Sequence, residues 1–553
     1  MTSSPASEAA GTLLGELIAH GVQDLVLAPG SRSQALALAA TALARSGALR
    51  VHVRVDERVA GFTALGLARE SGLPVAVVCT SGTAAGNLLP ATMEAFHAGV
   101  PLLLLTADRP PELRGVGANQ ATVQPGLFAP FVRMHVDAVV PTGEAGWDGL
   151  GAAAVRAALG VQGEGLDGVA GPVHLNLPTR EPLSAVVPIA AAAGPAPVPT
   201  APQPVVLPRG ARTVVIAGAD AGPDAEELSH AGGWPLIAEV VSGARFGRLL
   251  VHGYRKLLRD ESLGGRIERA VVFGHPTLSR EVAALLARDD VEVIAVRRGG
   301  ESLDLNGRTR AVPAATVADG DADRVWLGAW MSAAQAAMVD LSAPAPDQHG
   351  LYSEDRAQRL SAVRAELDAV RRRVDREILV DAVWRATWPH DRLMFGSSRL
   401  VRVADQVLGG KKVPVHANRG LAGIDGTIAT AIGIALASQG DGVPGVTRVL
   451  LGDLAFLHDV GALLLPADES RPRIQVIVGN DGGGTIFDGL EVASSAPAAD
   501  LDRAFYTPQA VQLSELAAAY GWEFARISTR SALDQALTSP VGGPQIIEVP
   551  LER

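Results

Sequence analysis

The sequence predicts an α/β protein built from three doubly wound parallel-sheet domains. Its length of 553 residues corresponds to about three domains of ordinary size. Short apolar runs rich in β-branched residues alternate with helical patterns, which is typical of parallel sheets covered by helices. Two proline-containing stretches, at 186–210 and 344–348, interrupt this alternation. We therefore expect domains at residues 1–186, 187–345 and 346–553.

Composition and charge limit the kinds of binding partner and the cellular compartment to be expected. The net charge is -11, and no basic run is long enough to follow a phosphate backbone, so we do not expect nucleic acid as a partner. The one cysteine, Cys79, excludes an intrachain disulfide and favours a reducing compartment. No apolar run approaches ~18 residues, and Met1–Ala10 lacks the basic n-region and apolar core that are typical of a signal peptide. The sequence predicts a cytoplasmic protein without membrane insertion.

The first segment shows the βα alternation most clearly. Apolar residues at helical spacing predict helices, and short β-branched runs predict buried strands. Helices are expected at Glu8–His20, Gln34–Arg45, Glu57–Glu70 and from Gly82. Strands are expected at Asp24–Ala28, Val51–Val55, Val75–Cys79, Leu102–Leu105 and Val173–Leu177.

Polar turns follow two of these strands. The turn Pro29–Ser33 contains Ser31 and Arg32, and the polar segment after Leu105 contains Arg109 and Gln120. Carboxyl ends of parallel strands meet at one edge of a sheet, where ligands bind. These four side chains are therefore candidate ligands for a carboxylate or phosphate. The alternative for the first turn is a capped helix with one surface arginine.

The middle segment repeats the pattern but offers little chemistry. Its strands are expected at Val214–Ala217, Leu236–Val240, Ala270–Phe273 and Val291–Val296. Gly218–Gly222 follows the first of these and resembles a dinucleotide-binding turn, but the third glycine and a ribose-binding acid are missing. A Rossmann-type nucleotide-binding protein is thus a less favoured alternative.

The last segment begins with a charged, solvated helix at Ser353–Arg376 and returns to the alternation. Strands are expected at Leu393–Phe395 and Val413–Val415, and a small-residue-rich helix at Thr427–Ser438. Arg402 and Arg419 follow the two strands, so two more guanidinium groups lie near strand ends.

A βαβ unit near the end of the chain carries the strongest chemical signal. Val449–Leu451 and Ile474–Val478 read as buried parallel strands, with Asp453 and Asn480 at their carboxyl ends. A carboxylate, an amide oxygen and a glycine-rich backbone form a hard oxygen site, which suits Mg²⁺ holding a diphosphate. The alternative is an ordinary βα turn with a helix-capping aspartate.

The spacing of this unit resembles a known family. Gly452-Asp453 followed 27 residues later by Asn480 is similar to the metal motif of thiamine-diphosphate enzymes. The resemblance implies pyrimidine- and diphosphate-binding domains flanking a middle domain, with Mg²⁺ or alternatively Mn²⁺ held by Asp453, Asn480 and Gly482. Asp481 stands where the family usually has a second asparagine, so it is an alternative metal ligand. Further cofactor contacts are implied for Ser398, Gly452 and Phe487.

The same resemblance assigns roles in activating the cofactor. The family requires a glutamate at the start of the helix after the second strand, and Glu57 stands there. A carboxyl group on the pyrimidine N1′ promotes deprotonation of the thiazolium C2, whereas the alternative is a helix-stabilising first-turn glutamate. Ile424 would be the apolar prop that keeps the cofactor bent. Because the family's active sites lie between subunits, a homodimer or homotetramer is implied.

Several motifs narrow the resemblance to the 2-succinyl-5-enolpyruvyl-6-hydroxy-3-cyclohexene-1-carboxylate synthases of menaquinone biosynthesis. They are Pro29–Ser33, Asp56–Arg58, Thr80–Thr83, Thr106–Leu113, Gly117–Gln120, Asn418–Gly420, Gly423–Gly426 and Gly452–Asp459. This family condenses 2-oxoglutarate with isochorismate and releases CO₂. Both substrates are dicarboxylates, which suits Arg32, Arg109, Arg402 and Arg419. The alternatives are another thiamine-diphosphate decarboxylase or carboligase, and a non-catalytic scaffold.

Overall fold

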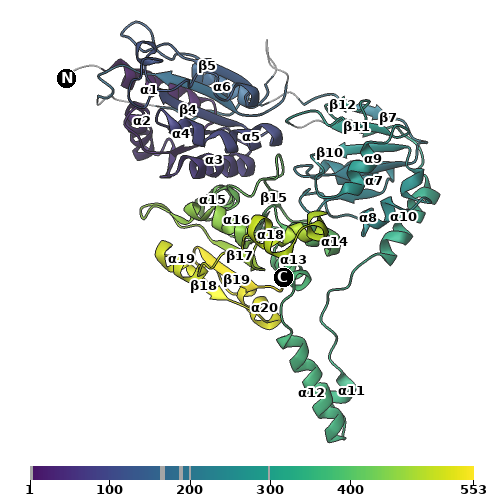
Figure 1. Ribbon diagram of the computed structural model, residues 1–553. Coiled ribbons are helices and arrows are strands. Elements are labelled where there is room, and N and C mark those ends of the chain that lie inside the picture. The colour runs from purple at the N-terminus through teal and green to yellow at the C-terminus, as the bar shows by residue number, and fades with distance from the viewer. Residues whose placement is uncertain (1–3, 162–167, 186–190, 199–200, 297–298) are drawn as a thin grey trace.

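A computed structural model of the chain describes residues 4–161, 168–185, 191–198, 201–296 and 299–553. Three parallel sheets follow one another along the chain, and helices cover their faces (Figure 1). The predicted α/β class is therefore confirmed. The predicted boundary at 186/187 falls on residues outside the described ranges, and both domain boundaries stay predictions.

The first sheet has the strand order β2-β1-β3-β4-β6-β5, and its paired strands run parallel. Its central strands are buried along their whole length, as expected for a sheet covered on both faces. The strands are β1 (Asp24–Leu27), β2 (Arg50–Val53), β3 (Val75–Cys79), β4 (Leu102–Asp108), β5 (Met134–Asp137) and β6 (Val173–Pro178). The helices are α1 (Pro5–Ala19), α2 (Gln34–Arg45), α3 (Glu57–Ser71), α4 (Thr83–Asn87), α5 (Leu89–Ala98) and α6 (Leu150–Ala158).

The last sheet has the order β15-β14-β16-β17-β19-β18, which is the order of the first sheet in its own strands. Its strands are β14 (Arg392–Phe395), β15 (Val415–Ala417), β16 (Thr447–Gly452), β17 (Ile474–Asn480), β18 (Glu523–Arg526) and β19 (Gln545–Pro550). Its helices include α13 (Arg376–Ala386), α14 (Arg399–Val407), α15 (Thr427–Ser438), α16 (Asp453–His458), α17 (Val492–Ser495), α18 (Ala498–Leu501), α19 (Leu513–Tyr520) and α20 (Arg530–Thr538). The two outer sheets therefore share one topology.

The middle sheet has the order β12-β11-β10-β8-β9, and β13 pairs with β7 beside it. The strands are β7 (Val205–Leu207), β8 (Thr213–Ala217), β9 (Leu236–Ala238), β10 (Arg269–Phe273), β11 (Glu292–Val296), β12 (Arg310–Val312) and β13 (Ala315–Val317). The helices are α7 (Asp224–Gly232), α8 (Tyr254–Leu258), α9 (Arg280–Leu286) and α10 (Arg324–Ala336). Beyond them, α11 (Gln348–Leu351) and α12 (Arg356–Arg371) project from the body of the molecule (Figure 1).

Several element boundaries differ from the prediction. The strand predicted to end at Leu105 continues to Asp108, because Thr106 and Asp108 hydrogen-bond to polar side chains on the neighbouring strand β6. The strand predicted at Val413–Val415 lies at Val415–Ala417, and the one predicted at Val51–Val55 ends at Val53. Six strands were not predicted, namely β5, β7, β12, β13, β18 and β19. Among the described helices, none is long and apolar enough to cross a bilayer.

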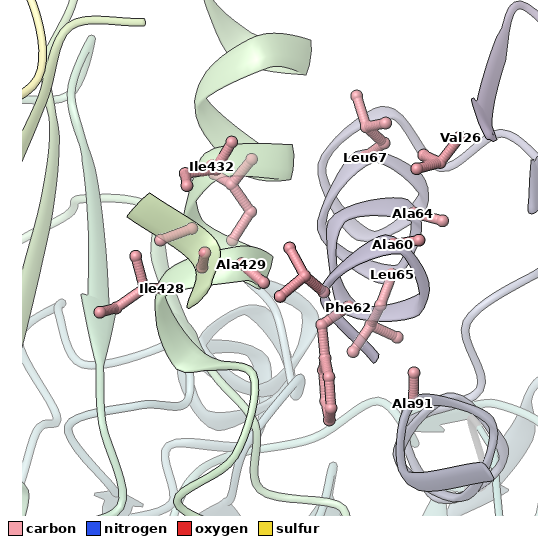
Figure 2. Close-up of a cluster of buried hydrophobic side chains, with 14 of the residues drawn as sticks. Val26, Ala60, Phe62, Ala64, Leu65, Leu67, Ala91, Ile428, Ala429 and Ile432 are labelled. Carbon is pink, nitrogen blue, oxygen red and sulfur yellow. The ribbon is translucent and has the colours of Figure 1, made fainter. Parts of the chain in front are cut away.

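Helices α3 and α15 join the first and last domains (Figure 2). Phe62 and Leu65 of α3 belong to the same buried cluster as Ile428 and Ile432 of α15. The helix axes come so close that a Cβ added at Gly66 would lie 2.0 Å from the backbone oxygen of Thr430. Glycine is therefore required at this crossing.

Candidate active site

The first group of predicted residues gathers at the carboxyl edge of the first sheet. The turn after β1 lies against the end of β3, since a Cβ on Gly30 would meet the Thr80 side chain at 2.2 Å. Within that turn the backbone N–H of Arg32 donates to Thr80 Oγ1 at 3.2 Å. The Arg32 guanidinium donates through Nη1 to the carbonyl of Thr179 at 3.4 Å, and Ser31 is exposed.

Gln120 and Arg109 come to the same edge from the segment after β4. Gln120 has φ 56° and exchanges two 2.9 Å hydrogen bonds with Ser81, one through its side-chain amide and one through its carbonyl. Arg109 is buried and donates through Nε and Nη2 to the Asn119 carbonyl at 3.0 and 2.9 Å. The predicted grouping of these side chains with the turn after β1 is therefore seen in the structure.

The second group lies at the carboxyl edge of the last sheet. Strands β16 and β17 are adjacent, and Gly452 pairs with Gly479, so Asp453 and Asn480 lie opposite one another directly after the paired residues. Asp453 is 7% exposed, and burial together with the nearby Asp481 raises its carboxyl pKa to about 6. Asn480 donates through Nδ2 to Glu548 at 2.9 Å, and its Oδ1 accepts the Gly482 N–H at 3.2 Å.

The residues present fit a hard cation. Asp453 is a desolvated carboxylate with no ion-pair partner among the described residues, which favours a bound cation there. Asp481 instead pairs with Arg376 at 2.6 Å and accepts a hydrogen bond from Thr485, so its charge is already compensated. The described residues contain no group of three or more His, Cys, Asp and Glu side chains arranged for a metal. One carboxylate, one amide oxygen and a glycine carbonyl would leave positions for ligand phosphates, as Mg²⁺ prefers.

The turn after β14 closes this edge from the neighbouring strand. Ser398 caps α14 by accepting the Leu400 N–H, and its Cβ lies 3.7 Å from the position of a Cβ on Gly452. Arg402 donates through Nη1 to the Ser398 carbonyl at 3.2 Å. Phe487, on the loop after β17, packs edge-on against Phe505 with ring centroids 5.4 Å apart. Ser398, Arg402, Gly452 and the aspartate–asparagine pair thus share one edge, as predicted.

Arg419 completes the second group through contacts that the sequence did not predict. It donates to Thr277 of the middle domain, from Nε to Oγ1 at 2.9 Å and from Nη2 to the carbonyl at 3.1 Å, and from Nη1 to Ser397 Oγ at 3.2 Å. Its exposed fraction is 3%. Burial lowers the pKa of the guanidinium, while Glu239 opposes this effect and Arg402 adds to it.

The four predicted arginines share one electrostatic property. Arg32, Arg109, Arg402 and Arg419 have no carboxylate within ion-pair distance in the described part of the chain, although many other arginines here are paired. Their protein contacts are carbonyl and hydroxyl oxygens. Partly or fully buried guanidinium groups without anions favour anionic ligands.

Glu57 begins α3, and Ile424 lies in the turn before α15. Glu57 is the first residue of α3, is half-buried, and has no hydrogen-bond or ion-pair partner among the residues described. The next residue, Arg58, places Nη1 3.0 Å from His458 Nδ1. His458 is the last residue of α16, and Asp453 is its first. Ile424 is 38% exposed and lies just before the buried helix α15.

The two groups remain separate within one chain. No hydrogen bond or ion pair of the described residues joins Ser31, Arg32, Arg109 or Gln120 to the edge that carries Asp453. The sequence analysis missed Thr277 and Arg376, which hold Arg419 and Asp481. Neither has a local sequence signal, because each acts on a residue more than a hundred positions away.

The middle-domain turn differs from a dinucleotide site. A Cβ on Gly218 would lie 2.1 Å from the backbone nitrogen of Pro276, so this side of the turn packs against neighbouring backbone. The first turn of the following helix, α7, carries Asp224, Glu226 and Glu227, and these charges disfavour a pyrophosphate. The structure therefore argues against the Rossmann-type alternative.

Comparisons with known proteins agree with this geometry. Residues 8–127 match the family described as thiamine pyrophosphate enzyme, N-terminal TPP binding domain. The chain is 53% identical to the 2-succinyl-5-enolpyruvyl-6-hydroxy-3-cyclohexene-1-carboxylate synthase of Leifsonia xyli subsp. xyli, over 100% of this chain and 97% of that protein. It is 52% identical to the synthase of the same name from Clavibacter michiganensis subsp. michiganensis, with the same coverage.

A solved structure shows the same fold. Benzoylformate decarboxylase from Polynucleobacter necessarius matches with a TM-score of 0.64 at 15% identity, over 100% of this chain and 99% of that one. This structural likeness at 15% identity shows the fold alone. The sequence identity of 52–53% to the synthases, over the full length of the chain, identifies the family. The chain belongs to the family of thiamine-diphosphate-dependent 2-succinyl-5-enolpyruvyl-6-hydroxy-3-cyclohexene-1-carboxylate synthases of menaquinone biosynthesis.

Proposed function

We propose that this chain condenses 2-oxoglutarate with isochorismate, using Arg32, Arg109, Arg402 and Arg419 to hold the substrate carboxylates. The observation that carries this assignment is that all four guanidinium groups lie at sheet edges without an ion-pair partner in the described residues. The two substrates are small dicarboxylates, and bidentate contacts with arginine give both affinity and orientation. Ser31 and Gln120 add neutral hydrogen-bonding groups beside Arg32.

The cofactor would bind at the carboxyl edge of the last sheet. Mg²⁺, or alternatively Mn²⁺, would be held by the side chains of Asp453 and Asn480 and the carbonyl of Gly482. The ion pair between Asp481 and Arg376 supports Asn480 rather than Asp481 as the ligand. Ser398, Gly452 and Phe487 line the same edge and would contact the cofactor. When bound, thiamine diphosphate supplies the electron sink that decarboxylation of a 2-oxoacid requires.

Glu57 and Ile424 would act on the cofactor directly. The Glu57 carboxyl, which has no hydrogen-bond or ion-pair partner in the described part of the chain, would hold a proton at the pyrimidine N1′ atom. Ile424 would give the cofactor an apolar surface to bend against, which its exposure supports. The arginines would fix both substrates before reaction, so orientation is supplied by the protein.

The separation of the two groups of residues supports an assembly. One chain presents an anion-binding edge on the first domain and a candidate metal-binding edge on the last, with no polar contact between these groups in the described residues. A homodimer or homotetramer would bring the first edge of one subunit to the second edge of another. We also propose domain boundaries at 186/187 and 345/346, between the three sheets.

Isochorismate consumption in the presence of 2-oxoglutarate tests this function. Consumption should require added thiamine diphosphate and Mg²⁺, and Glu57→Gln should lower kcat by about 100-fold or more. Glu8→Gln is the matched control, because Glu8 is a first-turn glutamate of α1 and is exposed. Its activity should equal that of the wild type.

Two results would count against the proposal. If pyruvate replaces 2-oxoglutarate without loss of rate, the enzyme is a different thiamine-diphosphate carboligase. If Glu57→Gln retains full activity, the proposed cofactor geometry is wrong even where the substrates are right.

A further inference from the structure

The segment that carries Arg419 lies where all three domains meet. From the first domain, Arg69 on α3 donates through Nη1 to the Ala417 carbonyl at 2.6 Å. Glu94 on α5 accepts the backbone N–H of Gly420 at Oε1 and that of Leu421 at Oε2, both at 2.9 Å. Arg69 Nη2 lies 3.6 Å from Glu94 Oε1, so the two side chains form a buried ion pair.

The middle domain holds the same segment from another side. The Thr277 hydroxyl and carbonyl accept two N–H groups of Arg419. The turn at Thr277 is itself held by Glu239, whose Oε1 accepts the N–H of Thr277 at 2.9 Å and that of Leu278 at 2.6 Å. Glu239 is fully buried, so these bonds are shielded from water.

Packing leaves the segment little freedom to shift. A Cβ at Gly420 would lie 2.9 Å from His97 Cβ and 3.0 Å from Glu94 Oε2. The backbone next to Arg419 therefore rests directly on α5. A rigid support of this kind keeps a binding side chain within a narrow range of positions.

We propose that Glu94 of the first domain and Thr277 of the middle domain are positioning residues, which clamp residues 417–421 and so aim the Arg419 guanidinium at a substrate carboxylate. This inference rests on the proposed role of Arg419. The three bonds to Thr277 and Ser397 use three of the five guanidinium N–H groups. One N–H remains on each terminal nitrogen, so two donors are left for a carboxylate. The middle domain thereby acquires a role in substrate binding.

Thr277→Val tests the middle-domain side of the clamp in the cofactor-loaded enzyme. Valine keeps the shape and the carbonyl but removes the acceptor for Nε. The KM for one of the two substrates should rise about tenfold, the effect of one charge-assisted hydrogen bond, while kcat changes less. Thr277→Ser, which retains the hydroxyl, should restore the KM. The control is Thr387→Val, because Thr387 is a buried threonine whose hydroxyl donates to the Val383 carbonyl of the helix that it follows, away from Arg419.

A double-mutant cycle separates positioning from a general structural effect. In an Arg419→Lys background, Thr277→Val should change the KM by less than twofold, because there is no guanidinium left to aim. Glu94→Gln should behave like Thr277→Val, since the two backbone N–H groups use different carboxylate oxygens, and the amide nitrogen that replaces one of them cannot accept. Additive effects of the Thr277 and Arg419 substitutions would overturn the clamp.

A failure of the proposed function would give a different result from a failure of the clamp. If Arg419→Lys alone leaves the KM of both substrates unchanged, the role of Arg419 is wrong and the clamp has no function in binding. If the Arg419 variant is too slow to measure, crystal structures of the two Thr277 variants decide. The guanidinium should leave Ser397 in Thr277→Val and keep it in Thr277→Ser, and an unmoved guanidinium in both would overturn the inference.

Discussion

Gly66→Ala should destabilise the protein, although alanine is the better helix former. Gly66 lies inside α3, where alanine would gain about 0.5–1 kcal/mol from helix propensity. The added Cβ, however, would lie 2.0 Å from the carbonyl oxygen and 2.8 Å from the carbonyl carbon of Thr430. Both are backbone atoms of α15 and cannot rotate away. The helices would have to separate by about 1 Å, which forfeits a quarter to a half of the dispersion energy of their contacts.

The same crossing is tight from the other side, where a Cβ at Gly433 would lie 2.1 Å from the Thr63 carbonyl oxygen. Overpacking of this kind costs about 1–3 kcal/mol, which exceeds the gain in propensity. Calorimetry should show an apparent Tm several degrees below that of the wild type. Gly328→Ala is the control, because Gly328 lies in α10 with no atom within 4 Å of an added Cβ, and it should stabilise slightly. A Gly66→Ala protein as stable as Gly328→Ala would refute this reasoning.

Three further predictions concern single groups. Burial raises the pKa of Glu239 to about 8, above its usual 4.5, so its contribution to stability is present at acidic pH and is lost as pH rises through about 8. Glu239→Gln should therefore show a smaller fall in Tm between pH 5 and pH 8, and equal slopes would contradict this. Asn480→Ala should weaken Mg²⁺ binding, measured by calorimetric titration with thiamine diphosphate present. Asp481→Asn should instead lower Tm, because its ion pair with Arg376 is lost, and should leave the Mg²⁺ affinity within a few-fold of the wild type. The reverse pattern would make Asp481 the ligand. Burial raises the pKa of the Cys79 thiol well above its usual range, so a thiol reagent should modify the protein only after denaturant is added, and rapid labelling of the native protein would show that β3 opens.

The sequence by itself determined the elements whose local signals agree with their surroundings. Helices α2 and α15 and strand β3 have the predicted bounds, because apolar periodicity and flanking turns mark both ends. Parallel pairing then placed Asp453 opposite Asn480, since strand ends of adjacent parallel strands share an edge. The family followed from short motifs at those edges, which need no knowledge of how the domains pack.

Tertiary structure alone decided which partners those residues have. The strand β4 extends to Asp108 because β6 supplies polar partners for Thr106 and Asp108, and no local pattern shows this. Arg419 is aimed by Thr277, which lies 142 positions away in another domain. Such contacts depend on how separately folded sheets dock. The sequence therefore predicted which polar side chains lie at the sheet edges, and only domain packing determined how each one is held there.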